Sequence, residues 1–299
     1  MVASGSSTIW SRTSTSSSTS DGRFARIAAA VRLTHPFPSI LDGLVVSAVA
    51  LVAGAAPMVA LQLGASMTAL QASIGALNDV HDAPDDAGRK PGKPIPAGLV
   101  GVPFARVVVL GGAVIGLALG AVVHPWIGLL GLVVLAIGYG YDLLAKGTAW
   151  SWLPFAVGIP ILPIYGWLGG AGSLPAFFIA LTPMAVLAGA ALAIANTRAD
   201  AERDLAAGTV SVATSLGLEG SWRLHAGLWG AAVTVALGWA VFRGVGLAEI
   251  APVLGAAGLI AAAALWSRRR DAASRERAWE FEAVATALAL LAWLAAVTR

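Results

Sequence analysis

Long apolar stretches, separated by short polar segments, recur from one end of this chain to the other. Stretches of about 20 apolar residues are long enough to cross the hydrocarbon core of a bilayer as α-helices. The pattern predicts nine spans, at residues 38–57, 60–78, 102–122, 126–143, 152–169, 176–196, 224–242, 247–266 and 279–297. The second is unusually polar between Gln62 and Ser73, so we expect it to face protein or a cavity rather than lipid.

Composition supports a membrane protein. The chain has 299 residues, of which 58% are hydrophobic and 12% charged, and its mean hydropathy is +0.79. A soluble domain carries about 25% charged residues. We therefore expect an all-α integral membrane protein. Because the chain has no cysteine, disulfides and thiolate metal sites are excluded.

Lys and Arg residues fall mainly on one of the two sides of the membrane that the predicted spans define. Lys and Arg fall in the N-terminal segment and in every second connection, and of the cations only Arg243 and Arg299 fall on the opposite side. The positive-inside rule then predicts a cytoplasmic N-terminus, cytoplasmic polar loops and a C-terminus outside. A basic face beside anionic lipid accounts for the pI of about 9.7, so no nucleic-acid partner is needed.

The chain divides into a polar N-terminal segment and one membrane domain. Residues 1–22 are rich in Ser and Thr and are predicted to be disordered. Residues 23–33 have basic and apolar side chains at helical spacing, which predicts a short interfacial helix before the first span. The domain is expected to cover residues 23–299, and the pattern carries no indication of an oligomeric state.

Two acidic runs of the form N-x-x-x-D-x-x-x-D begin at Asn78 and at Asn196, each at the end of an apolar stretch. Residues at i, i+4 and i+8 drift by only about 40° per step around a helix, so each run is expected to present its oxygens on one face. Hard divalent cations and the phosphates they bridge need such oxygens. The two runs together predict diphosphate chemistry inside a membrane.

Basic residues accompany both runs. Arg89, Lys90 and Lys93 follow the first run on a turn rich in Pro and Gly, while Arg198 and Arg203 lie within the second. Cations would weaken a metal site unless a polyanion were held between metal and cations. The alternative interpretation is a pair of solvated loops whose charges compensate one another.

At this point the chain resembles a known family. The first run, continued by K-P-G-K-P-I-P-A-G, is similar to the first signature of the UbiA superfamily of intramembrane prenyltransferases. Asp200 and Asp204, followed by Gly208 and Ser211, resemble its second signature. Two further elements, the segment 31–37 and the pair Tyr141 and Lys146, are also similar to the family, and the resemblance extends over about residues 30–297.

The resemblance implies nine transmembrane helices around a central cavity that opens toward the cytoplasmic face, with the acidic loops as caps. It implies a prenyl diphosphate donor, Mg²⁺ as cofactor and a hydrophobic acceptor. The implied metal ligands are Asn78, Asp82, Asp86, Asp200 and Asp204, with Asp79 and Asn196 in support. The implied diphosphate-binding residues are Lys90, Lys93, Lys146, Arg198 and Arg203, and the implied catalytic residues are Asp82, Asp200, Tyr141 and Lys146.

An allylic cation needs a dry pocket with electron-rich walls. Aromatic side chains that could line it are Tyr139, Tyr141, Trp152, Phe155, Tyr165 and Trp167, although aromatics near membrane interfaces are usually belt residues. Asp142 is expected to pair with Lys146, the alternative being that it accepts the proton lost in the reaction. His81 is interpreted as an exposed loop residue rather than a metal ligand.

Other functions stay open at the level of sequence. A terpene cyclase would use the same acidic runs and trap the cation without an acceptor. A transporter would place polar residues near the bilayer midplane. Because the charged residues fall mainly at the ends of the predicted spans, we favour transfer of a prenyl group. The P-I-P-x-G segment looks more like the chlorophyll-synthase and archaeal ether-lipid branches than the hydroxybenzoate branch, but it does not identify the acceptor.

Overall fold

Every regular element is helical in the part of the chain that this computed structural model describes, residues 18–87, 90, 92–269 and 271–298. The all-α expectation is therefore confirmed for those residues. The elements are α1 (Ser18–Leu33), α2 (Pro36–Val52), α3 (Pro57–Asp86), α4 (Val102–Val123), α5 (Pro125–Gly140), the π-helical turn η1 (Tyr141–Ala145), α6 (Leu153–Ala171), α7 (Phe178–Ala199), α8 (Ala201–Ala207), α9 (Val212–Phe242), α10 (Leu247–Trp266) and α11 (Ala272–Val297).

Within these described residues, seven helices are long and apolar enough to cross a membrane: α4, α5 with η1, α6, α7, α9, α10 and α11. An eighth is reached if α1 and α2, which meet at a bend of 50°, count as one span. α3 is long but too polar to qualify. The predicted count of nine spans is thus only partly supported, although each predicted range falls on a long helix.

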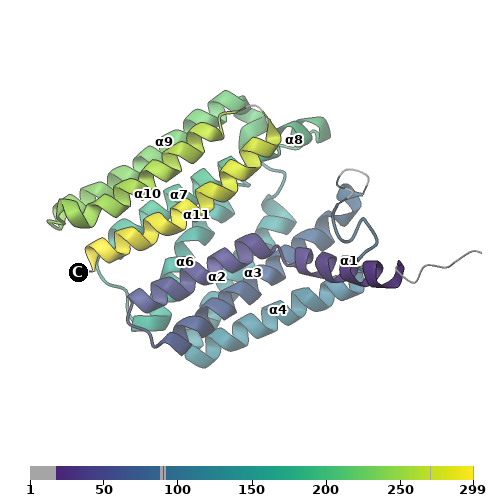
Figure 1. Ribbon diagram of the computed structural model, residues 1–299, viewed down its shortest axis with the longest axis horizontal. Helices are drawn as coiled ribbons and strands as arrows, with labels where there is room; N and C mark the ends of the chain where they lie inside the picture. The colour runs from purple at the N-terminus through teal and green to yellow at the C-terminus, as the bar shows by residue number, and fades with distance from the viewer. Residues whose placement is uncertain (1–17, 88–89, 91, 270, 299) are drawn as a thin grey trace, which may run out of the picture.

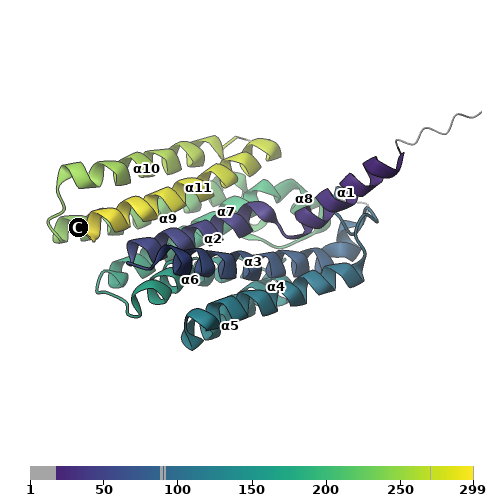
Figure 2. The same ribbon diagram turned by 60° about the horizontal axis from the view of Figure 1, so that its bottom comes forward.

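The long helices run side by side in two groups (Figures 1 and 2). α3 packs between α2 and α4 in one group, while α10 packs against α11 in the other, and α7 contacts both α6 and α9. The C-terminal end of α3, which carries the first acidic run, and α8, which carries part of the second, lie at the same end of the molecule as α1 (Figure 1). Helix packing therefore brings two motifs separated by more than a hundred residues to one end of the bundle.

The polar side of α3 is turned toward protein, as the sequence predicted. Ser66 Oγ hydrogen-bonds the carbonyl of Gly116 at 2.6 Å and the Tyr165 hydroxyl at 2.7 Å. α3 also approaches α2 closely, because a Cβ at Gly43 would lie only 2.7 Å from the Gly64 carbonyl oxygen. Small residues allow this close contact between membrane helices, and α3 is thereby held firmly against its neighbours.

A buried ionisable pair joins α9 to α11. His225 Nε2 and Glu282 Oε1 are 2.6 Å apart, both side chains are fully buried, and Trp229 also donates to Glu282. Charged groups in a membrane domain are stable only when they are paired. Both residues lie close to the start of their predicted spans, and the pairing accounts for two ionisable groups that are buried there.

At the N-terminus, α1 contains the whole of the predicted helix 23–33 and begins earlier, at Ser18. Most of the segment predicted to be disordered, residues 1–17, lies outside the described residues.

Candidate active site

The first acidic run lies on one continuous helix. α3 extends to Asp86 through Pro84, so Asn78, Asp82 and Asp86 stand at i, i+4 and i+8 of a single α-helix. The prediction that the three side chains share a helix face is confirmed. His81 is exposed, as expected, but it lies on the helix and not in a loop.

Two of these residues contact the turn that follows α5. Lys146, which ends η1, forms an ion pair with Asp82, and Asn78 Nδ2 donates to Asp142 Oδ1 at 2.7 Å. Asp142 is thus paired with Asn78, and the predicted pairing of Asp142 with Lys146 is wrong. The reason is helix packing: η1 lies across α3, so each of its polar side chains meets a different turn of α3.

The π-helical geometry of η1 matters for this contact. A π-helical turn is rare and occurs frequently at functional sites. Tyr141 and Asp142 are the first two residues of η1, and the backbone becomes extended at Lys146 before Gly147 adopts a positive φ of 74°. The chain reverses there without burying Lys146, which leaves its ammonium group beside Asp82.

The lysines after α3 fold back onto its last turns. Lys93 pairs with the buried Asp79 and lies 3.8 Å from Asp86 Oδ2, while Lys90 Nζ lies 3.5 Å from Asp86 Oδ1. Buried carboxylates are stable when paired with cations in this way. The lysine turn and the acidic run therefore form one cluster of alternating charge.

His35 joins this cluster from the start of α2, which the sequence did not reveal. Its Nε2 lies 3.0 Å from Asp79 Oδ1, and its backbone has the left-handed conformation with φ 47°. A Cβ at Gly75 would lie 2.9 Å from the Cβ of His35, so the glycine makes room for the ring. Left-handed conformations of non-glycine residues often occur at functional sites.

The second acidic run does not lie on one helix. α7 ends at Ala199, Asp200 has the non-helical angles φ −97° and ψ 0°, and α8 begins at Ala201. The prediction that Asn196, Asp200 and Asp204 share one helix face is therefore wrong. The break turns α8 away from the axis of α7, and Asp200 pairs locally with Arg203.

The Gly and Ser of the second signature have clear structural roles. Gly208 ends α8 with a positive φ of 68°, a conformation that glycine adopts without steric cost. Ser211 begins α9 as the first member of a capping box with Thr214. The signature thus encodes a short helix, a tight reversal and a new helix start directly behind the acidic run.

Electrostatics connect the second run with the first. Burial raises the pKa of Asp204, while the positive charges of Lys90, Arg203 and Lys146 oppose this rise. Two of these cations belong to the first cluster. The loops also approach each other, since a Cβ at Gly147 would lie 3.6 Å from the Thr209 side chain. Asp204 therefore lies within electrostatic range of the lysines that face the first run.

Arg198 is not near the lysines. Its guanidinium is buried and donates to the carbonyl of Leu218, to Ser221 Oγ at 3.1 Å and to the carbonyl of Ser267 at 2.7 Å. These contacts join the end of α7 to α9 and α10. Arg198 therefore contacts α9 and the end of α10 and not the predicted diphosphate-binding lysines. These contacts stabilise the break between α7 and α8.

Arg275 on α11 also contacts the residues on both sides of the break between α7 and α8. Its Nε donates to the Arg198 carbonyl at 2.6 Å, and its guanidinium pairs with Glu202 of α8. Arg275 follows a run of basic residues in the sequence, but its side chain is almost completely buried. Because it is bonded on both sides of Asp200, Arg275 sets the direction in which α8 leaves α7.

The oxygen atoms of the site fit a hard cation. The described residues contain no group of three His, Cys, Asp or Glu side chains gathered closely enough to hold a metal by themselves. Mg²⁺ usually takes only one or two carboxylates, with water and substrate phosphate as the remaining ligands. Asp86 Oδ2 and Asp142 Oδ2 are buried without a hydrogen-bond partner, so oxygen atoms are present that a cation would satisfy.

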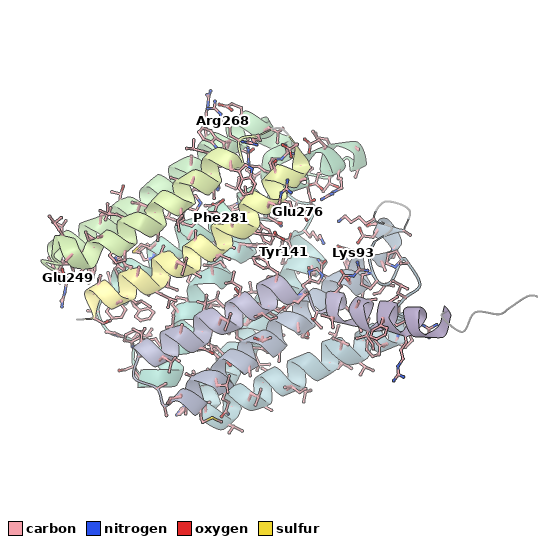
Figure 3. The ribbon with its side chains drawn as sticks, in the orientation of Figure 1. Lys93, Tyr141, Glu249, Arg268, Glu276 and Phe281 are labelled. Carbon is pink, nitrogen blue, oxygen red and sulfur yellow. The ribbon has the colours of Figure 1, made fainter. Side chains whose placement is uncertain are left out.

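An apolar cavity begins next to the charged cluster. It is lined by α2, α6, α7, α9, α10 and α11, and its walls include Phe37, Phe155, Trp229, Trp279 and Trp293. Figure 3 shows Tyr141 on the same side of the molecule as Lys93. Tyr141 packs edge-to-face on Phe155 at 5.6 Å between ring centres, and its hydroxyl is within electrostatic range of Asp82 and Asp204. Tyr141 thus stands between the charged cluster and the cavity.

The aromatic residues predicted to line this cavity are only partly the ones found. Phe155 lines the cavity. Tyr139 and Tyr165 instead hydrogen-bond serines of α3, and Trp167 packs on Phe177. The three tryptophans of α9 and α11 were missed, because nothing in the sequence indicates that these helices line the same cavity as α6.

Comparison with known proteins agrees with this geometry. A model of the UbiA prenyltransferase family matches residues 42–287, and the chain therefore belongs to that family. Chlorophyll synthase from the chloroplast of Oryza sativa subsp. japonica is 29% identical over 154 residues, which are 48% of this chain and 41% of that protein. The chain thus matches less than half the length of this curated relative.

Solved structures show the same fold. The structure of a digeranylgeranylglyceryl phosphate synthase has a TM-score of 0.69 and 15% identity, covering 93% of this chain and 99% of that one. A UbiA homologue from Archaeoglobus fulgidus, bound to GPP and Mg²⁺, has a TM-score of 0.67 and 19% identity, covering 88% of this chain and 99% of that one. At such identities the likeness establishes the fold alone.

Proposed function

We propose that this protein transfers a prenyl group from a prenyl diphosphate to a hydrophobic acceptor in a Mg²⁺-dependent reaction that releases pyrophosphate. The observation that carries the proposal is the placement of Asp82 and its partner Lys146 beside Tyr141, whose ring packs on Phe155 in the wall of the apolar cavity. Charged groups suited to a diphosphate thus adjoin a space suited to a hydrocarbon chain. Both parts of a prenyl diphosphate have a matching environment.

The acidic residues would hold the metal. Asn78, Asp82 and Asp86 offer oxygens from one face of α3, while Asp200 and Asp204 offer theirs from the break and from α8. When bound, Mg²⁺ neutralises negative charge that develops on the departing diphosphate. Asp79 is paired with His35 and Lys93, and we assign to it the positioning of Lys93.

The lysines would bind the diphosphate. Lys90, Lys93 and Lys146 come from two loops on either side of the acidic face, and each already lies beside a carboxylate. Ammonium groups can turn from a carboxylate to a phosphate with little loss, because the lysine stem is flexible. Arg203, which is half exposed beside Asp200, is a further candidate, whereas Arg198 is left out because both of its terminal NH groups donate within the fold.

The cavity would hold the hydrocarbon and keep water away from the allylic cation. Its lining is aliphatic and aromatic, which removes competing nucleophiles. Tyr141 lies within electrostatic range of Asp82 and Asp204 and packs on Phe155, so we assign to these two rings the stabilisation of positive charge on the departing carbon.

The family and the solved relatives support the proposal. The Archaeoglobus fulgidus homologue has been solved with GPP and Mg²⁺, which are a donor and a cofactor of the proposed kinds. Seven or eight membrane-spanning helices among the described residues agree with a reaction inside a bilayer. We further propose that the N-terminus and the acidic loops are cytoplasmic and that the C-terminus lies outside.

The proposal is tested with purified protein, labelled prenyl diphosphates of several lengths and a membrane lipid extract. Asp82→Ala and Asp200→Ala are expected to lose Mg²⁺-dependent pyrophosphate release while remaining folded. Glu249→Ala, which changes an acidic residue at the opposite end of the molecule, serves as the matched control (Figure 3). Full activity in both Asp variants would overturn the assignment. The mass of the product separates transfer to an acceptor from cyclisation, in which no acceptor atoms are added.

A further inference from the structure

The apolar cavity contains one ionisable side chain that the proposed reaction does not use. Asp42, on α2, lines the cavity together with residues that are otherwise apolar except for Thr286 and the indole N–H groups of Trp229, Trp279 and Trp293. An ionisable group in a membrane domain is costly, and it is usually retained for a function. No motif surrounds Asp42, which falls inside a predicted span, so the sequence alone does not single it out.

Asp42 is held in place by α3. Gln71 Nε2 donates to Asp42 Oδ2 at 2.7 Å. The two helices are fixed at this level by the close approach at Gly43 and Gly64, where a Cβ would lie 2.7 Å or less from the facing carbonyl oxygen. The carboxylate is therefore oriented by a rigid pair of helices and not by a flexible loop.

The second oxygen of Asp42 is not used by the protein. Among the described residues, no hydrogen bond joins Asp42 Oδ1 to a side chain or a backbone group. Thr286 cannot serve as its donor in this arrangement, since the threonine hydroxyl donates to the Glu282 carbonyl of its own helix at 2.7 Å. Asp42 Oδ1 is thus an available hydrogen-bond acceptor in the otherwise apolar lining of the cavity.

The depth of this group follows from helix geometry. Gln71 precedes Asn78 by seven residues on α3, and Asp42 follows His35 by the same number at the start of α2. At 1.5 Å per residue, both helices place the pair about 10 Å below the charged cluster. The hydrocarbon chain of a prenyl diphosphate has no donor that could reach an oxygen at this depth. The group must therefore serve another molecule in the cavity.

We propose that Asp42, oriented by Gln71, binds a hydroxyl group of the acceptor and so selects an acceptor that carries a hydroxyl on an otherwise hydrophobic body. The proposal rests on the proposed function, because it concerns the second substrate of the same cavity. Asp42 accepts a hydrogen bond from that hydroxyl, and its partner Gln71 keeps the carboxylate from turning away. An acceptor without such a group leaves a buried polar atom unsatisfied and is disfavoured.

The test is a binding measurement that needs no turnover. A bromoalkanol and the bromoalkane of the same chain length are titrated into the purified protein in detergent, and quenching of tryptophan fluorescence is recorded. Trp229, Trp279 and Trp293 line the cavity and report occupancy. We expect the bromoalkanol to bind about tenfold more tightly than the bromoalkane, as one additional hydrogen bond to the Asp42 carboxyl group predicts.

Variants assign the preference to Asp42. Asp42→Leu is expected to bind both probes equally. Because this change leaves Gln71 without a partner, the double variant Asp42→Leu/Gln71→Leu, which removes both polar groups, is measured beside it and is expected to behave in the same way. Thr286→Val is the matched control, since it removes the hydroxyl of another polar side chain of the wall and should keep the preference.

Equal binding of the two probes to the native protein would overturn the inference and reduce the Asp42–Gln71 pair to a contact between helices. A preference that survives in the double variant would overturn it as well. Neither result touches the proposed function, which is tested separately by Mg²⁺-dependent pyrophosphate release.

Discussion

Asn78 on α3 donates its side-chain amide to the buried carboxylate of Asp142 in η1, with 2.7 Å between Nδ2 and Oδ1. The two residues are 64 positions apart, and their hydrogen bond fixes the π-helical turn against the acidic face of α3. Tyr141 is the first residue of that turn and Lys146 follows its last residue. The contact between Asn78 and Asp142 therefore sets the distance of both residues from Asp82. It connects the face that we propose to bind the metal with the residues that we place around the departing diphosphate.

Removing this contact is expected to slow the reaction more than it weakens donor binding. Asp142→Ala leaves Asn78 without its partner and frees η1, so the turnover number should fall on the order of tenfold to a hundredfold, as small displacements of catalytic groups do. Initial rates of pyrophosphate release over a range of donor concentrations measure this. Glu249→Ala is again the control, and an unchanged turnover number in Asp142→Ala would contradict the role given to the contact.

The Mg²⁺ concentration that the reaction requires should change when single acidic residues of the site are replaced. Chelation is expected to abolish pyrophosphate release, and added Mg²⁺ should restore it. Asp86→Asn and Asp204→Asn each keep an oxygen but lose a charge, so the Mg²⁺ concentration that gives half the maximal rate should rise by about tenfold. Exposed Asp85, next to Asp86, supplies the control Asp85→Asn, which should titrate like the native protein. Release that persists without any divalent cation would refute the metal assignment.

Gly75 provides a test of the position of His35. In Gly75→Ala the new methyl group would lie 2.9 Å from the His35 Cβ, so the ring must move away from Asp79. Overpacking of this kind costs about 1–3 kcal/mol, and activity should fall together with thermal stability.

The matched change is Gly111→Ala on α4, where no atom lies within 4 Å of the added Cβ. It should leave activity unchanged and stabilise the protein by up to about 1 kcal/mol, because alanine favours the helix over glycine. Unfolding midpoints in detergent compare the two variants. A Gly75→Ala protein as stable and active as Gly111→Ala would show that the close approach of His35 has no importance.

The membrane orientation can be measured directly, because the chain has no cysteine of its own. Single cysteines at Arg268, near the start of α11, and at Glu249, near the start of α10, lie at opposite ends of the bundle (Figure 3). A membrane-impermeant maleimide added to intact cells should label Glu249→Cys and spare Arg268→Cys. Labelling of Arg268→Cys instead, with Glu249→Cys protected, would invert the proposed topology.

The sequence by itself determined the helical class, the approximate ranges of the long helices and the shared face of Asn78, Asp82 and Asp86. These features depend on hydrophobicity and on the period of a single helix, both of which are local. For the same reason, α3 was correctly expected to face protein. The family resemblance also rested on short local signatures, and the family match confirms it.

The tertiary structure alone decided which groups meet. The pairing of Lys146 with Asp82, the arrival of His35 at Asp79 and the contact between Asp42 and Gln71 all join separate helices, so no spacing along the chain predicts them. The break at Asp200 likewise depends on Arg198 and Arg275, which bind carbonyls contributed by distant elements. Helical periodicity says which side of a helix a residue occupies, whereas packing decides what lies opposite that side.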